Sequence, residues 1–171
     1  MDTTDTPQAG TNLNVEISIS SSEACLLSAM MHNRDDDLLR RIAGKLDPAD
    51  FESPIFAKIF TGIAELLTEH RPCDPAAVRS HITAKGERDG LPADALNTTI
   101  VGLLTLDAID LHAGEYARQV ASASYRRQFA RMADGLRHAA ETAPEAELLP
   151  IMVQYGIGQR KAWERYQGME F

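Results

Sequence analysis

Ser53–His70 reads SPIFAKIFTGIAELLTEH, and the organisation of the whole chain follows from this stretch. Ser53 is a favourable helix cap, and Pro54 stands at the first helical position, where a missing N–H costs nothing. At about 100° per residue the apolar side chains fill one arc of roughly 140°. They are Ile55, Phe56, Ile59, Phe60, Ile63, Leu66 and Leu67. The arc is too wide for a two-stranded seam, so the stretch predicts a helix that several neighbours bury.

Shorter helices are expected on both sides of this central helix. Their candidate caps are Ser21 or Ser22, Asp35 or Asp36, and Asp74. Gly44 is placed to end the second helix and Gly86 follows the fourth, while a fifth opens at Pro92 or Ala93. Residues 46–51 predict a turn that points Phe51 inward. The pattern predicts an all-α protein with a compact multi-helix head over residues 21–111.

The charge and the residue composition argue against several classes of function. The 171 residues carry a formal net charge of −8, from 17 basic and 25 acidic residues, which argues against a general nucleic-acid binder. No run of apolar residues is long enough for a membrane span, and the start of the chain lacks a secretory signal. The two cysteines form no disulfide framework. We therefore expect a cytoplasmic protein with no membrane association.

The first 20 residues are acidic and rich in Thr, Ser and Asn, so residues 1–20 are expected to form a disordered tail. Val15, Ile17 and Ile19 alternate, which leaves a short strand-like docking segment as an alternative.

No signature of catalysis is present. The chain contains no phosphate-binding loop, no Gly-x-Gly-x-x-Gly and no His-Glu-x-x-His. His70, Cys73 and Asp74 lie close together, but a metal site would need a further ligand, and a helix end followed by a capping aspartate explains them better. We expect no enzyme, no catalytic residue, no metal site and no cofactor.

The longest periodic stretch changes its apolar face part-way along. Its first half presents Tyr116, Val120 and Ala123, whereas its second half presents Tyr125, Phe129, Met132 and Leu136. The two stripes point more than about 100° apart, which indicates a helix that leaves the head and meets a second surface. Leu148, Met152, Tyr155, Trp163 and Tyr166 recur at helical spacing in the last stretch. Because proline disfavours a helix interior, this return helix is expected to begin at Pro150, which predicts a long helix and helical hairpin over residues 112–168.

Arginines gather on the second half of the long helix. They are Arg126, Arg127, Arg131 and Arg137, and we call them the arginine strip. The simpler interpretation is the solvated back of an amphipathic helix. The alternative is a local basic surface for an acidic partner or a DNA backbone.

Taken together, the chain resembles the N-terminal domain of DnaB-type replicative DNA helicases. The resemblance covers roughly residues 23–166, and its motifs are Glu23-Ala24 leading into Leu26-Leu27-x-Ala29-Met30, Asp50-Phe51, Ile59-Phe60 with Ile63 and Leu66-Leu67, Pro72-Cys73-Asp74 with Val78, Lys85-Gly86, and Glu115-Tyr116-Ala117-x-x-Val120. The chain departs from the family at Asp89-Gly90-Leu91-Pro92, where a Gly-Gly and an aromatic-Leu pair are usual. The ATPase domain is also missing up to Phe171, as in a fragment or a stand-alone relative.

The resemblance implies an all-helical, non-catalytic domain whose hairpins pair into dimers, and which forms a collar that binds primase and loader proteins. By position, the hairpin would comprise residues 126–142 and 150–166. We therefore expect a homodimer and a replicative helicase or primase as partner, with direct DNA binding through the arginine strip as the alternative function. The expected partner and dimer interface comprises Tyr125, Phe129, Met132, Leu136, Met152, Tyr155 and Trp163.

Overall fold

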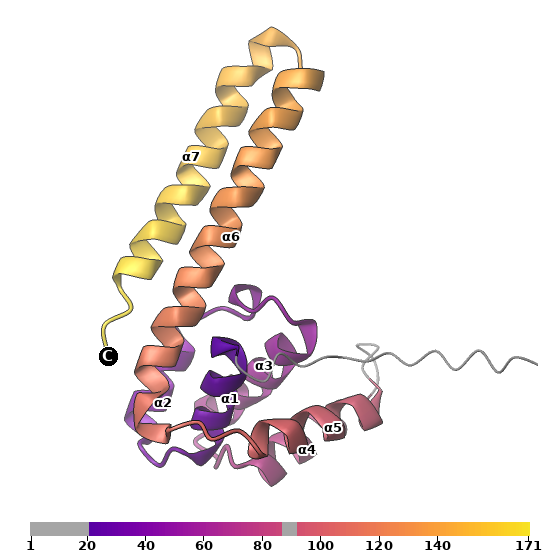
Figure 1. Cartoon of the computed structure of the whole chain (residues 1–171), viewed down its shortest axis with the longest axis vertical. Helices are drawn as coiled ribbons and strands as arrows, with labels where there is room; N and C mark the ends of the chain where they lie inside the picture. The colour runs from indigo at the N-terminus through magenta and orange to yellow at the C-terminus, as the bar shows by residue number, and fades with distance from the viewer. Residues whose placement is uncertain (1–20, 87–91) are drawn as a thin grey trace, which may run out of the picture.

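The computed structural model describes residues 21–86 and 92–171 and consists of helices and their connections (Figure 1). The elements are α1 (Ser22–His32), α2 (Asp36–Lys45), the 3₁₀ turn η1 (Pro48–Asp50), α3 (Pro54–Thr68), α4 (Pro75–Ala84), α5 (Ala93–Leu104), the 3₁₀ turn η3 (Asp110–His112), α6 (Ala113–Thr142) and α7 (Glu145–Gln167). None of the described residues lies in a β-strand. The prediction of an all-α head with an attached hairpin is confirmed. The expected tail, residues 1–20, lies outside the described residues, as do residues 89–91 of the family departure.

The core of the head forms around α3. Ile59, Ile63 and Leu66 are fully buried, and the Phe60 ring lies 4.8 Å from that of Phe51, which the turn η1 directs inward as predicted. Helices α1, α2 and α4 all pack on α3, so the wide apolar arc is covered from several sides. Burial of a large apolar side chain contributes about 1.5–3 kcal/mol, which makes this arc the main source of stability in the head.

Local signals place most helix ends where the sequence predicts them. Ser21, Asp35 and Asp74 cap α1, α2 and α4 through side-chain oxygens that accept backbone N–H groups. Gly86 follows α4 with a φ of 76°, a conformation that glycine adopts without strain. The prediction that Gly44 ends α2 is wrong, because the helix continues to Lys45 and is closed at Leu46.

Ser53 precedes α3 but its hydroxyl makes no capping hydrogen bond. Glu23 of α1 instead holds the chain that leads into the helix. Its Oε1 accepts a hydrogen bond from the backbone N–H of Glu52 at 2.7 Å, and its Oε2 accepts one from that of Ser53 at 3.4 Å. The position where the central helix begins is therefore fixed by a neighbouring helix.

Helix α6 belongs to two regions of the molecule, as its change of apolar face predicts. Its first half packs on α1 through buried Ala117 and Val120, and its second half projects from the head and pairs with α7 (Figure 1). At the transition, the Tyr125 ring lies 5.5 Å from that of Trp163 and 5.8 Å from that of Tyr166. The head and the hairpin therefore share one continuous helix.

The expected start of the return helix at Pro150 is wrong. Helix α7 begins at Glu145 and carries Pro150 in its interior, so the hairpin arm is five residues longer than predicted. Pro150 removes one intrahelical hydrogen bond, to the carbonyl of Ala146, and this loss is limited to the second turn. Packing of α7 along α6 keeps the helix continuous despite the missing hydrogen bond.

The chain returns to the head after α7. The Lys45 ammonium donates hydrogen bonds to the carbonyls of Gly168 and Glu170, each at 2.5 Å, and lies 4.9 Å above the Phe171 ring. Met169 is buried in the core of the head. The free end of the hairpin is thus its tip, while both helices are fixed at its base.

Candidate functional site: the hairpin and its anchor

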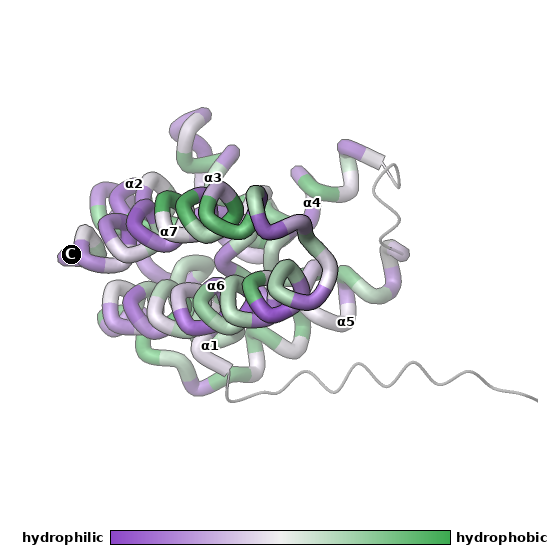
Figure 2. The backbone as a smooth tube through the Cα atoms, turned by 90° about the horizontal axis from the view of Figure 1, so that it is seen from above, coloured by the Kyte–Doolittle hydropathy of each residue, from purple (hydrophilic) through white to green (hydrophobic). Residues whose placement is uncertain are grey.

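The outer surface of the hairpin carries an uncommon concentration of exposed apolar side chains. Phe129 of α6 is 49% exposed, and Met152 and Trp163 of α7 are 52% and 44% exposed. Leu149, Val153 and Ile157 add to the exposed apolar surface of α7. Figure 2, which views the molecule from above, shows the first turns of α7 as a strongly hydrophobic stretch. Apolar clusters of this kind on a surface usually mark an interaction site.

The seven predicted interface residues divide into two groups. Tyr125, Met132 and Leu136 are partly buried between the two arms, whereas the exposed ones are Phe129, Met152, Tyr155 and Trp163. Tyr125, Met132 and Trp163 line one shallow hollow together with Gly156, Gln159 and Arg160. The structure therefore brings side chains of both arms onto one face of the hairpin.

Tyr155 sets the spacing of the two arms. Its phenol lies against the backbone of α6 at Gly135, where a Cβ built on the glycine would overlap the hydroxyl oxygen and lie 3.2 Å from Cε1. Any larger side chain at position 135 would displace Tyr155 or separate the helices. Gly135 and Tyr155 together permit the close approach of α6 and α7.

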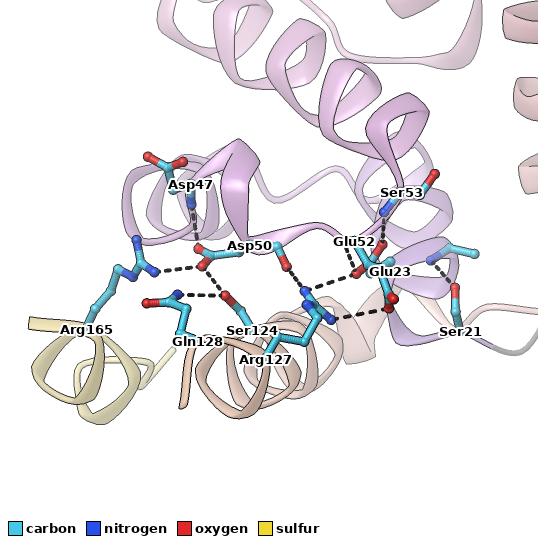
Figure 3. A network of polar contacts seen from close by, with 11 residues as sticks. Ser21, Glu23, Asp47, Asp50, Glu52, Ser53, Ser124, Arg127, Gln128 and Arg165 are labelled. Carbon is cyan, nitrogen blue, oxygen red and sulfur yellow. Dashed lines mark hydrogen bonds and ion pairs between the residues drawn. The ribbon is translucent and has the colours of Figure 1, made fainter. Parts of the chain in front are cut away.

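A buried carboxylate anchors the hairpin to the head (Figure 3). The side chain of Asp50, in η1, is 1% exposed, and its Oδ1 accepts hydrogen bonds from Ser124 of α6 at 2.6 Å and Arg165 of α7 at 2.7 Å. Its Oδ2 accepts the backbone N–H of Asp47 at 2.8 Å. A buried carboxylate needs such partners, because an unpaired one is strongly destabilising. Asp50 therefore joins both arms of the hairpin to one turn of the head.

A second connection lies beside the first and uses Arg127 of α6. Its guanidinium donates a hydrogen bond to the carbonyl of Asp50 and lies 3.5 Å from Oε1 of Glu23 and 3.7 Å from Oε2 of Glu52. Glu23, which is 7% exposed, also accepts the backbone N–H groups just before α3. The approach to the central helix and the seating of α6 thus depend on one carboxylate (Figure 3).

The arginine strip is divided by these contacts. Arg126 and Arg131 are exposed, and Arg137 pairs with Asp134 of its own helix at 2.8 Å. Arg127 faces the head and is engaged there. Only part of the predicted strip therefore presents its charge to solvent.

The other candidate residues have structural positions. The Cys73 thiol is buried and donates a 3.6 Å hydrogen bond to the carbonyl of Met30, and burial together with the nearby Asp36 carboxylate raises its pKa. Asp74 caps α4. Within residues 21–86 and 92–171, no three His, Cys, Asp or Glu side chains are grouped as metal ligands would be. None of the described helices has the length and apolarity to cross a membrane.

Comparison with known proteins agrees with this architecture. The sequence matches the family described as "DnaB-like helicase N terminal domain" over residues 16–122, more than half of the chain. The chain belongs to this family. The crystal structure of the N-terminal domain of DnaB helicase from Mycobacterium tuberculosis has the same fold, with a TM-score of 0.66 and 21% sequence identity over 80% of this chain and 94% of that one. No curated protein matches the chain with significance.

As a member of the DnaB N-terminal family, the chain is a helicase-associated interaction module. The family match ends at residue 122, just where α6 leaves the head. The described hairpin beyond Ser122 therefore carries the features that the family match does not cover.

Sequence reasoning did not find the anchor of this DnaB-type domain. Glu23 and Asp50 are part of the motifs that carry the resemblance, but their sequence patterns predicted neither the contacts of Glu23 nor those of Asp50. The contacts of Arg165 and Ser124 were not predicted either. The sequence did not distinguish Asp50, which is buried before Phe51, from Glu52, which is exposed after it, although a carboxylate that turns inward needs a polar partner.

Proposed function

We propose that this chain is a non-catalytic dimerisation and protein-interaction module of DNA replication. The observation that carries the proposal is the exposed apolar face of a hairpin whose base is fixed by buried hydrogen bonds. Phe129, Met152 and Trp163 remain exposed along one pair of helices, whereas the exposed large apolar side chains of the head are Val101, Leu104, Ile109 and Leu111. A two-fold contact between hairpins would bury the same face on both copies.

The rigid base supports this role physically. Asp50 binds both arms, and Arg127 ties α6 to Glu23 of α1 and to the carbonyl of Asp50, so the hairpin emerges in one direction. A surface that is held in place loses less conformational entropy on association than a mobile one. Such a module suits a collar, in which domains present fixed surfaces to one another and to partners.

The oligomeric state is the direct test. We expect sedimentation of the wild-type chain to show a homodimer at micromolar concentration. The double variant Phe129→Asp with Met132→Asp should sediment as a folded monomer, because charges are very costly in a dry interface. A matched double variant, Arg126→Asp with Arg131→Asp, changes charge on the same helix and should leave the dimer intact. A wild type that remains monomeric at high concentration would contradict the proposal.

The partner is proposed from the family, as a replicative helicase or a primase. Co-purification of the chain with each of these, and loss of binding in the monomeric double variant, would support it. Direct DNA binding has less support, because Arg127 is engaged with Glu23 and Asp50 and the chain is acidic overall. DNA binding that falls steeply with salt and is lost in the Arg126→Asp and Arg131→Asp variant would favour this alternative instead.

A further inference from the structure

A second hollow, which we call the basal hollow, lies where α2, η3, the first turns of α6 and the segment after α7 meet. It is at the end of α6 opposite to the hairpin tip (Figure 1). Its volume is about 530 Å³, which is within the size range of ligand sites in proteins. None of the seven predicted interface residues of the hairpin lines it. The basal hollow is therefore a separate surface.

One wall of the basal hollow is held in place by contacts within the chain. The Lys45 ammonium binds the carbonyls of Gly168 and Glu170 and lies above the Phe171 ring. On its other side Phe171 packs against Gly114, where a Cβ built on the glycine would lie 3.1 Å from the Cβ of Phe171. Because these contacts exist in the free chain, a ligand would meet a preformed wall and would not have to order it.

Two arginines line the basal hollow without an ion pair. Arg41 comes from α2 and Arg118 from α6, and neither has a carboxylate within 4 Å among the described residues. Arg40, the neighbour of Arg41, pairs instead with Asp36 and Asp37 of its own helix. A guanidinium matches a carboxylate with two parallel hydrogen bonds. The basal hollow thus presents two unpaired carboxylate-binding groups from different helices.

Acidic groups in the basal hollow narrow the kind of ligand. Glu115 and Glu170 also line it and form no ion pair with any described residue. Two glutamates balance the charge of the two arginines, so the basal hollow is close to neutral at pH 7 when His112, which also lines it, is uncharged. A nucleic acid or a polyphosphate would be repelled by the glutamates. A peptide segment can instead present a single carboxylate to the arginines.

An apolar side chain stands at the same place. Leu111 lines the basal hollow and is 81% exposed, more than any other large apolar side chain that the structure describes. Ile109, two positions earlier, is 49% exposed. Leu38 and Met169 add apolar surface inside the basal hollow. Apolar surface of this kind beside polar groups is typical of a site that binds another protein.

We propose that the basal hollow binds a short segment of a partner protein in which an acidic residue adjoins a large apolar one. The carboxylate of the segment pairs with Arg41 and Arg118, and its apolar side chain packs on Leu111. This inference rests on the protein-interaction part of the proposed function and adds a contact surface and the chemistry of the partner. It does not require the dimer.

Selection from a phage-displayed library of random peptides on the intact chain tests the site without a known partner. The selected peptides are synthesised and titrated by fluorescence polarisation. We expect them to carry Asp or Glu next to Leu, Ile, Phe or Trp. Their affinity should fall at least about tenfold in Arg41→Ala and in Arg118→Ala, because each change removes a charged hydrogen-bond donor. Arg126→Ala, at another exposed arginine of α6, is the matched control and should leave the affinity within about twofold.

The possible outcomes separate the basal hollow from the hairpin. Selected peptides without an acidic residue, or peptides that bind equally well to the double variant Arg41→Ala with Arg118→Ala, would overturn the proposed site. Displacement of the peptides by inorganic phosphate or by an oligonucleotide would mean a general anion site and would also overturn it. Loss of the dimer in the double variant would show an interface between copies in place of a partner site. A wild type that is monomeric but binds the peptides through both arginines would support the basal hollow, although the proposed dimerisation would then fail.

Discussion

In the head, α3 is surrounded by α1, α2 and α4 and buries nearly all of its apolar arc, with Ile59 and Ile63 fully inaccessible. In the hairpin, two helices of greater length cover each other along one side only, and Phe129 and Met152 keep about half of their surface in solvent. The difference follows from the number of layers. A helix with three neighbours can bury a wide arc, whereas a helix with one neighbour leaves its flanks exposed for another molecule.

The largest expected effect compares two phenylalanines. Phe60→Ala should lower the free energy of unfolding by about 3–5 kcal/mol, because it leaves a cavity beside Phe51. Phe129→Ala should cost less than about 1 kcal/mol in dilute samples, where the ring is half exposed. Chemical denaturation of both variants measures the contrast. Equal losses would mean that the hairpin is as closed as the head.

Most of this contrast could be predicted from the sequence. The arc of α3 and the change of face along α6 are periodic features, and periodicity reports which side of a helix is buried. The anchor could not be predicted in this way, since Asp50 and Arg165 are 115 positions apart and meet only after the chain has folded. The same limit explains the contact that fixes the start of α3. Ser53 has the right residue type, but Glu23, 30 positions away, binds its N–H.

The next effect concerns the joint between the two regions. Asp50→Ala should destabilise the protein by about 2–4 kcal/mol, because it removes the partner of Ser124 and Arg165 and the reciprocal cap of η1. Chemical denaturation measures the total loss of unfolding free energy, and hydrogen exchange shows which helices lose protection. Loss of protection should concentrate in η1, the middle of α6 and the end of α7.

Asp134→Ala is the matched control for the anchor, since it removes an exposed carboxylate that pairs with Arg137 of its own helix. Its effect should stay within about 0.5 kcal/mol, as for an ordinary surface change. An Asp50→Ala variant as stable as this control would show that the head and the hairpin hold together without the anchor.

A smaller effect is expected inside the hairpin. Gly135→Ala should cost about 1–3 kcal/mol, because the added methyl group overlaps the Tyr155 hydroxyl, so that the phenol is displaced or the arms separate. The double variant Gly135→Ala with Tyr155→Ala should recover part of the loss, which a double-mutant cycle would measure as coupling. Gly44→Ala is the control, since its site is open and the change should stabilise α2 by up to about 1 kcal/mol. Additive effects of the two hairpin changes would contradict the proposed contact.

The smallest effect belongs to the surface of the head and depends on pH. Glu65 of α3 forms ion pairs with Lys85 and with Nε2 of His81, the latter at 2.8 Å, and the hydrogen bond from Lys85 is the main reason why the pKa of Glu65 is lowered. A carboxyl whose pKa is lower in the folded than in the unfolded state stabilises the fold above its unfolded pKa of about 4.3. That contribution is lost as the pH falls through the lowered pKa that Glu65 has in the folded protein. Glu65→Gln should therefore cost up to about 1 kcal/mol at pH 7 and progressively less below about pH 4, until Glu65 is neutral in the folded protein as well. Urea denaturation from pH 3 to pH 7 would show the two stability curves converging in acid, and Lys85→Met should shrink the gap at neutral pH. Stability curves that stay parallel down to pH 3 would mean that Glu65 stabilises the head without its charge. The ion pairs with Lys85 and His81 would then contribute nothing measurable to the free energy of unfolding.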